Sequence, residues 1–247
     1  GREVVLMAVL LLLWGALSIT TETFLTLNNI GAILYQVAPI AIIGVGMTAV
    51  MVTAGIDVSV GSQIAVVMVV VAQVVRDVGV GLPVALLIGV VVGTALGAVN
   101  AFLITVARIH PMIVTFGTLN IFRFVALLIF GDQQVDGVPP TLGVLGGSNQ
   151  AITFGIPNAF WIAIVLVALM WSYMRSWAGG RHLYAIGGDP QAARLAGVKV
   201  KRATAGVYLL TGACVGLAGV IMIGSGGLVQ QNIGSGLELQ VIAAAVI

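Results

Sequence analysis

Charged residues are scarce in this sequence. Only 7% of its 247 residues are Asp, Glu, Lys or Arg, whereas 60% are hydrophobic. Soluble domains carry about 25% charged residues, so a soluble fold could not bury this much apolar surface. The scarcity of charge therefore excludes a soluble globular domain and indicates that lipid surrounds most of the chain.

Residues that carry catalytic and metal chemistry are also few. The one cysteine, Cys214, lies in an apolar run and supplies neither a disulfide nor a metal framework. The two histidines, His110 and His182, stand at expected helix ends beside basic residues. The sequence has no His-Glu-x-x-His motif and no Gly-x-x-x-x-Gly-Lys-Ser/Thr phosphate loop. These absences argue against an intramembrane enzyme and exclude a phosphate-loop ATPase, and we expect no cofactor and no metal site.

Long apolar runs fill the rest of the sequence. A membrane-spanning helix needs about 20 mostly apolar residues. The runs predict an all-α, polytopic transmembrane helix bundle of about eight helices, about seven of them full spans and the last one short. They are Val4–Ile19, Ile30–Thr53, Val58–Val75, Leu82–Val106, Pro111–Phe130, Ala159–Trp177, Ala203–Ile223 and Leu237–Ile247. We expect one domain over residues 1–247, and we expect it to be a fragment of a longer protein because it lacks an initiator Met and stops inside an apolar run.

The basic residues indicate how this bundle is oriented. If the N-terminus is cytoplasmic and the runs alternate, most of the 10 basic residues fall on the inner side. They are Arg2, Arg108, Arg175, Arg181, Arg194, Lys199, Lys201 and Arg202. Cytoplasmic loops are rich in Lys and Arg. The pattern therefore predicts that Gly131–Pro157 lies outside and that residues 178–202 lie inside.

A polar segment on the expected inner side reads as a short capped helix. Asp189 is a good N-cap, Pro190 fits the first helical position, and Gly197 fits a C-terminal cap. The middle of this helix is small, since it contains Ala192, Ala193 and Ala196. Small side chains suit docking into a groove of another protein. The alternative is a surface helix that lies on the membrane.

Two charged residues interrupt apolar segments and leave two readings each. Asp57 follows a glycine break, and it either caps the next helix near the inner interface or takes part in gating. Arg123 lies within an apolar run, and it either extends outward to the interface or faces the substrate path.

A slight internal similarity links two parts of the chain. A glycine break followed by Asp57 and an apolar run resembles the later glycines followed by Glu238 and another run. Inverted repeats of this kind are common in transporters. The similarity is weak enough that chance is the better explanation.

Four segments of the sequence carry a family resemblance. They are Thr53–Ser62, Pro111–Leu119, Gly180–Val198 and Gly234–Ala245. In this order they resemble the permease subunits of bacterial ABC importers of the ribose, xylose and autoinducer type. Gly180–Val198 is similar to the cytoplasmic coupling segment of that family and Thr53–Ser62 to its Gly-Ile-Asp-Leu-Ser-Val-Gly-Ser hallmark, whereas the other two match more weakly. Departures at Met112 and Phe124, where family members often have Phe and Gly, bear on substrate contacts.

The resemblance implies a permease for a sugar or sugar-like solute in the bacterial inner membrane. The partners that it implies are an ATPase subunit, a second permease copy or paralogue, an extracytoplasmic solute-binding protein and membrane lipid. It implies no nucleic acid partner. The residues expected to couple to the ATPase within the coupling segment 178–202 are Gly187, Asp189, Pro190, Ala192, Ala193, Arg194, Leu195 and Gly197. The residues expected in the substrate path or in gating are Asp57, Ser59, Asn100, Thr115, Arg123 and Glu238.

Two alternatives to a sugar importer stay open at this point. One is the related permease for branched-chain amino acids, against which the motif around Asp57 argues. The other is a secondary transporter that is driven by ions and needs no ATPase.

Overall fold

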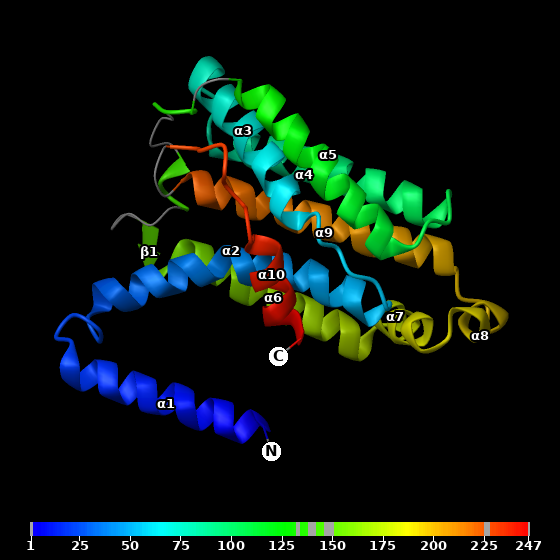
Figure 1. Cartoon of the computed structure of the whole chain (residues 1–247), viewed down its shortest axis with the longest axis horizontal. Helices are drawn as coiled ribbons and strands as arrows, with labels where there is room; N and C mark the ends of the chain where they lie inside the picture. The colour runs from blue at the N-terminus through cyan, green and yellow to red at the C-terminus, as the bar shows by residue number, and fades with distance from the viewer. Residues whose placement is uncertain (1, 132–133, 138–141, 146–150, 225–227, 247) are drawn as a thin grey trace.

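The structure, a computed structural model, is a bundle of long helices (Figure 1). It describes residues 2–131, 134–137, 142–145, 151–224 and 228–246. The long helices in this part of the chain are α1 (Arg2–Thr20), α2 (Leu27–Val52), α3 (Val60–Val78), α4 (Leu82–Thr105), α5 (Pro111–Phe130), α6 (Asn158–Ser176) and α9 (Val200–Ile223). The shorter elements are β1 (Ile152–Thr153), β2 (Ile156–Pro157), α7 (Ala178–Gly188), α8 (Pro190–Leu195) and α10 (Leu237–Val246).

Each of the eight apolar runs forms a helix, so the predicted all-α bundle is confirmed. Six of these helices, α2 to α6 and α9, are long and apolar enough to cross a membrane. The other two carry shorter apolar stretches, Met7–Thr20 in α1 and Leu237–Val246 in α10.

The most extensive contact between two helices joins α4 and α9, and glycines form it. Gly89, Gly93 and Gly97 recur every fourth residue on α4, and Gly212 and Gly216 do so on α9. A Cβ at Gly93 would overlap the carbonyl oxygen of Gly212, and one at Gly216 would overlap that of Gly89. Small residues at this spacing let two helix backbones touch in a membrane, where van der Waals packing replaces the hydrophobic effect.

Helix α9 is the central element of the bundle. It packs against α2 and α3 as well as α4, and half of its 24 residues are buried. At Gly46 of α2 a Cβ would come within 2.6 Å of the Thr211 Cα, so this crossing also requires glycine. The hydroxyl of Tyr35, also on α2, donates a 2.7 Å hydrogen bond to the Ile221 carbonyl.

Two helices begin inside the bundle rather than at its end. From the end of α2, which lies beside α7, the chain turns back toward the middle of the bundle before α3 begins (Figure 1). Helix α10 begins against the start of α3, because a Cβ at Gly61 would lie 2.5 Å from the Gly234 carbonyl and overlap the Glu238 carboxylate. The starts of the two helices that follow the weakly paired segments therefore meet in space. Of the later glycines in that pairing, Gly226 and Gly227 lie outside the described residues.

Short contacts between loops lie at the end of the bundle that is far from α7 and α8 (Figure 1). Strands β1 and β2 form a hairpin whose turn residues, Phe154 and Gly155, both have positive φ, at 53° and 78°. Two such residues characterise the tight turn that suits hairpins. Val135 and Val229 form an isolated β-bridge that ties the loop after α5 to the segment before α10. The segment predicted to lie outside, residues 131–157, is described only in part.

We expect a single methyl group at the α4–α9 contact to destabilise the protein. Gly93→Ala should lower the free energy of unfolding by about 1–3 kcal/mol, because its Cβ meets backbone that cannot move aside cheaply. The matched control is Gly117→Ala on α5, where a Cβ meets nothing within 4 Å. Denaturant titration in mixed micelles measures both. Equal stability of the two variants would show that the glycine contact is unimportant.

Candidate functional site

Asp57 anchors a tight turn in the connection between α2 and α3. It is fully buried, and its Oδ1 accepts hydrogen bonds from the backbone N–H of Ser59 at 2.9 Å and from the Ser59 hydroxyl at 2.5 Å. The N-cap of α3 is Ser59, which makes no side-chain cap bond. The prediction that Asp57 caps the helix is therefore wrong in detail: Asp57 holds the turn that precedes the helix.

Two amide side chains complete the surroundings of this carboxylate. The Gln63 and Asn100 amide groups donate to Asp57 Oδ2 at 3.2 and 3.4 Å, and both also donate to the Ser59 hydroxyl, at 2.8 and 2.9 Å. All four residues are buried. Because a buried carboxylate is costly unless hydrogen bonds surround it, these neutral donors explain how Asp57 stays in the bundle.

The cluster of Asp57, Ser59, Gln63 and Asn100 lies inside the bundle. Asn100 is five residues from the end of α4, and Thr115, whose hydroxyl donates to the Ile56 carbonyl at 3.1 Å, is four residues from the start of α5. At about 1.5 Å of rise per residue, Asp57 lies about 6–8 Å inward from these helix ends.

Three polar atoms near this cluster are buried without a hydrogen-bond partner among the described residues. They are Gln63 Oε1, Asn100 Oδ1 and the Tyr208 hydroxyl. The Tyr208 hydroxyl lies over the break, 2.7 Å from where a Cβ of Gly55 would stand. Unpartnered polar atoms in a native core mark a place where water or a ligand can bind, or where the contacts change between states.

Arg123 joins the two helix starts. Its guanidinium donates to the Ile233 carbonyl at 2.7 Å and to the Gly61 carbonyl at 3.3 Å, so it links α5 to α3 and to the segment before α10. Glu238, in the first turn of α10, lies against Gly61. Arg123 is therefore turned into the bundle, and the outward orientation considered from the sequence is wrong. All six residues predicted for the substrate path lie around the start of α3.

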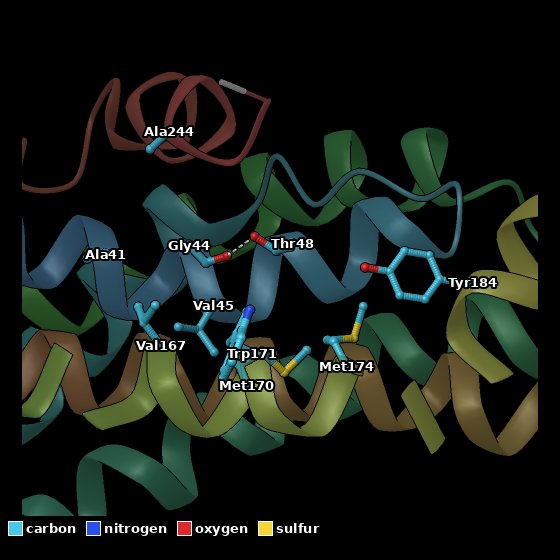
Figure 2. Close-up of a pocket in the computed structure, with 10 residues that line it drawn as sticks. All are labelled: Ala41, Gly44, Val45, Thr48, Val167, Met170, Trp171, Met174, Tyr184 and Ala244. Atoms are coloured by element: carbon cyan, nitrogen blue, oxygen red, sulfur yellow. Dashed lines mark hydrogen bonds between the residues drawn. The ribbon is translucent and has the colours of Figure 1, made fainter. Parts of the chain in front are cut away.

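Two cavities of different chemistry flank this region. One of about 420 Å³ lies between α2 and α6, where Trp171, Met170 and Met174 face α2 (Figure 2). Its Thr48 hydroxyl donates to the Gly44 carbonyl of its own helix at 2.8 Å, and most of the wall is apolar. The other, of about 350 Å³, is lined by four uncharged amide side chains, which are Gln134, Gln230, Gln231 and Asn232. Only the second offers several hydrogen-bonding groups to a polar solute.

The short helix α8 has the caps that the sequence predicts. Asp189 accepts the backbone N–H groups of Gln191 at 2.8 Å and Ala192 at 3.1 Å, and Pro190 takes the first helical position. Gly197, with φ 86°, follows the C-cap, and the N–H of Val198 bonds to the Ala193 carbonyl at 3.0 Å. This is a Schellman ending, which explains the glycine.

The exposed face of α8 differs from the predicted one. Ala193 is buried against Ile186 of α7 and Val198, so its side chain is not available to another protein. Leu195, in contrast, is 91% exposed. Ala192 and Arg194 are exposed beside it. The expectation that Ala193 meets a partner is therefore corrected: Ala193 packs α8 onto α7, and Leu195 is the outward apolar residue.

A direct contact links this region to the turn of Asp57. Gly187, near the end of α7, packs so closely on the end of α2 that a Cβ there would overlap the Val52 carbonyl oxygen. The connection that holds Asp57 begins at the next residue, Thr53. A displacement of α7 therefore acts directly on the break between α2 and α3.

Comparison with known proteins decides the family. A sequence profile described as the permease component of branched-chain amino acid transport systems matches residues 29–247. The chain belongs to this permease family. It is 33% identical over 239 residues to the ribose import permease protein RbsC of Escherichia coli, which covers 96% of this chain and 74% of the relative.

Other permeases are similar over nearly the whole chain. The D-allose transport system permease protein AlsC of Escherichia coli is 34% identical, over 98% of this chain and 73% of its own length. The autoinducer 2 import system permease protein LsrC of Yersinia pseudotuberculosis is 31% identical, over 100% of this chain and 69% of its own length. No solved structure matches significantly. The protein is thus a multi-pass membrane permease component of an ABC importer, not its catalytic subunit.

Several residues of the site are missing from the sequence-based prediction. Gln63 and Tyr208 lie on helices whose other residues are mostly apolar. The only sequence signal for them is that their own side chains are polar. The amides of the second cavity do leave a signal, since Gln230, Gln231 and Asn232 are consecutive between two apolar runs of the permease. That signal gives no hint that Gln134, far away in the chain, joins them.

We expect Asp57 to be structural. Asp57→Ala should lower the free energy of unfolding by about 1–3 kcal/mol, because buried donors lose their acceptor. Asp57→Asn should cost less and keep uptake, because its side-chain oxygen still accepts from the backbone N–H and the hydroxyl of Ser59. Unfolding in micelles, with exposed Asp77→Asn as the control, measures this. A folded Asp57→Asn variant that imports nothing would assign the charge to gating instead.

Proposed function

We propose that this permease imports a neutral sugar or sugar-like solute of the ribose, allose or autoinducer 2 class. The observation that carries the proposal is similarity at 31–34% identity, over 96–100% of the chain, to import permeases named for these solutes. Their names differ from one another, so the similarity supports the class and leaves the individual solute open.

The amide-lined cavity supports a neutral solute. Amide side chains both donate and accept hydrogen bonds, which suits a hydroxylated molecule. The side chains of Gln134, Gln230, Gln231 and Asn232 carry no charge, and all four residues are exposed, so they form an open polar surface that a hydroxylated solute can contact. A branched-chain amino acid, which appears in the description of the family, is disfavoured by the similarity to sugar import permeases.

The proposed orientation places α7 and α8 in the cytoplasm of the bacterial cell, and with them the coupling segment 178–202. Arg175, Arg181 and Arg194 lie in or beside these helices, and Arg108 follows α4. In Figure 1 the end of α6 and the start of α9 also lie at this end of the bundle. Basic residues collect on the cytoplasmic side of membrane proteins, which favours a cytoplasmic N-terminus and an inner-membrane location.

The proposed mechanism couples an ATPase subunit to the cluster around Asp57. Leu195 and its exposed neighbours on α8 dock on the ATPase. When ATP closes the ATPase dimer, α8 and α7 move together because Ala193 and Ile186 pack them as one unit. The Gly187–Val52 contact passes the movement to the break before α3. The break and Arg123 then change the contacts between α3 and α10 and open the solute path to the other side.

Two further partners complete the proposed importer. An extracytoplasmic binding protein delivers the solute to the end of the bundle that carries the β-hairpin and the amide-lined cavity. A second permease, either the same chain or a paralogue, pairs with this one across the path. Both follow from the ABC permease family and from the opposed positions of α8 and the hairpin in the bundle.

The orientation predicts which engineered cysteines are accessible in intact cells. Phe154→Cys, in the exposed hairpin turn, should react with an impermeant thiol reagent, whereas Gln191→Cys on α8 should react only after lysis. Both are placed in a Cys214→Ala background, where the removed thiol is buried. Labelling of residue 191 but not of residue 154 in intact cells would invert the proposed topology.

Uptake in reconstituted vesicles tests the function and the coupling residue together. With the ATPase and with binding protein loaded with ribose, allose or autoinducer 2, at least one solute should accumulate only when ATP is present. Leu195→Ser should reduce uptake and retention of the ATPase by about tenfold or more, because burial of an exposed leucine side chain stabilises an interface by about 1.5–3 kcal/mol.

The uptake experiment has a control variant and two outcomes that would contradict the proposal. Phe154→Ser removes a side chain that is 93% exposed at the opposite end, and it should leave retention of the ATPase unchanged. Uptake that an ion gradient drives without ATP would contradict the ABC mechanism. A Leu195→Ser variant that retains the ATPase and imports normally would remove α8 from the docking surface.

A further inference from the structure

A groove between α6, α7 and α9 lies apart from the cluster around Asp57. Its volume is about 420 Å³, and it opens on the outer surface of the bundle. Its apolar wall is formed by Met170, Leu183, Ala203, Val207 and Leu210, and its polar lining includes Tyr173, His182, Lys199 and Arg202. The groove therefore has an apolar length and a basic end.

The basic end carries charges that nothing in the described chain neutralises. Lys199 and Arg202 are exposed, and neither forms an ion pair or a side-chain hydrogen bond with a described residue. Between residues 158 and 223 the sequence contains six Lys and Arg residues but a single acid, Asp189, whose carboxylate caps α8. A basic end without a counter-charge attracts an anionic group from outside the chain.

The apolar part extends from this basic end along α9. From Lys199 to Leu210 the chain rises by about 16 Å, at about 1.5 Å per residue. Gly206 lies within this length, and a Cβ there would meet nothing within 4 Å, so the groove is open beside it. Leu210 is 37% exposed in a segment long and apolar enough to cross a membrane. The groove thus has an apolar surface that extends away from the basic residues and can hold an acyl chain.

We propose that this groove binds an anionic phospholipid. The phosphate lies between Lys199, Arg202 and His182, and one acyl chain follows α9 past Gly206 to Leu210. Basic pockets between membrane helices bind anionic head groups, and the hydrocarbon bed distinguishes a lipid from a free phosphate. Because residues of both α7 and α9 line the groove, the bound lipid stabilises the packing of α7 and α8 against the rest of the bundle.

The binding is measured by native mass spectrometry of the intact permease in detergent, titrated with phosphatidylglycerol or phosphatidylcholine. Wild type should bind phosphatidylglycerol at least about tenfold more tightly than phosphatidylcholine, since each basic group near an anionic head group adds to the attraction. The double variant Lys199→Gln/Arg202→Gln should lose this preference. Its matched control, Arg194→Gln/Lys201→Gln, removes the same charge outside the groove and should keep it.

A second variant tests the apolar bed independently of charge. Gly206→Phe fills the open space and should weaken binding of phosphatidylglycerol about tenfold, whereas Gly117→Phe, on an equally open position of α5, should not. Inorganic phosphate should fail to displace the lipid. Displacement by phosphate would indicate a free-anion site instead.

Three further results would overturn the proposal. They are equal affinity for the two lipids, equal losses in the groove variant and in its charge-matched control, and release of the lipid when the ATPase assembles with the permease. The last result would show that the ATPase occupies the groove. Retention of phosphatidylglycerol in the assembled complex supports the lipid.

Discussion

The close glycine contact between α4 and α9 is the constraint on which the rest of the bundle depends. Gly97 of α4 stands so near α9 that a Cβ would overlap the Tyr208 carbonyl oxygen. Two side chains near Asp57 lie beside this contact. Asn100 is one turn beyond Gly97 on α4, and Tyr208 is the contact residue on α9. A wider separation of these helices would move both groups away from the carboxylate. In lipid, where helices gain no hydrophobic energy from association, such contact of backbones is a principal source of specificity.

The second constraint is the start of α3 within the bundle. Backbone polar groups in the membrane must find partners in the protein, and a chain that leaves one helix and enters another at depth exposes several of them. Asp57 accepts the Ser59 N–H, Thr115 donates to the Ile56 carbonyl, and Arg123 donates to the carbonyls of Gly61 and Ile233. The same groups that satisfy the break also connect α4, α5 and the segment before α10 to it, which makes the break a natural point for movement.

The short helix α8 illustrates how far sequence reasoning reaches. Its caps are local, since Asp189 bonds to residues two and three positions on, and they were predictable from residue type and spacing. Which face of α8 is free is not local. It depends on how α8 folds onto α7 through Ala193, Ile186 and Val198, and for that reason Ala193 was assigned to the wrong side. Arg123 is a similar case, because its carbonyl partner Ile233 is 110 residues away.

The sequence by itself determined the helices, the caps of α8, the resemblance to ABC sugar permeases and six of the polar residues around the start of α3. The length of an apolar run, the caps of a helix and the order of motifs are each read from one segment of the chain. They can therefore be recognised without knowledge of the fold. Only the tertiary structure decided that Asp57 meets Asn100 across 43 residues, that Gln134 joins Gln230 in one cavity, and that α3 and α10 begin against each other. These contacts depend on which helix faces touch, and in an almost uniformly apolar sequence the pattern of side chains does not specify those faces.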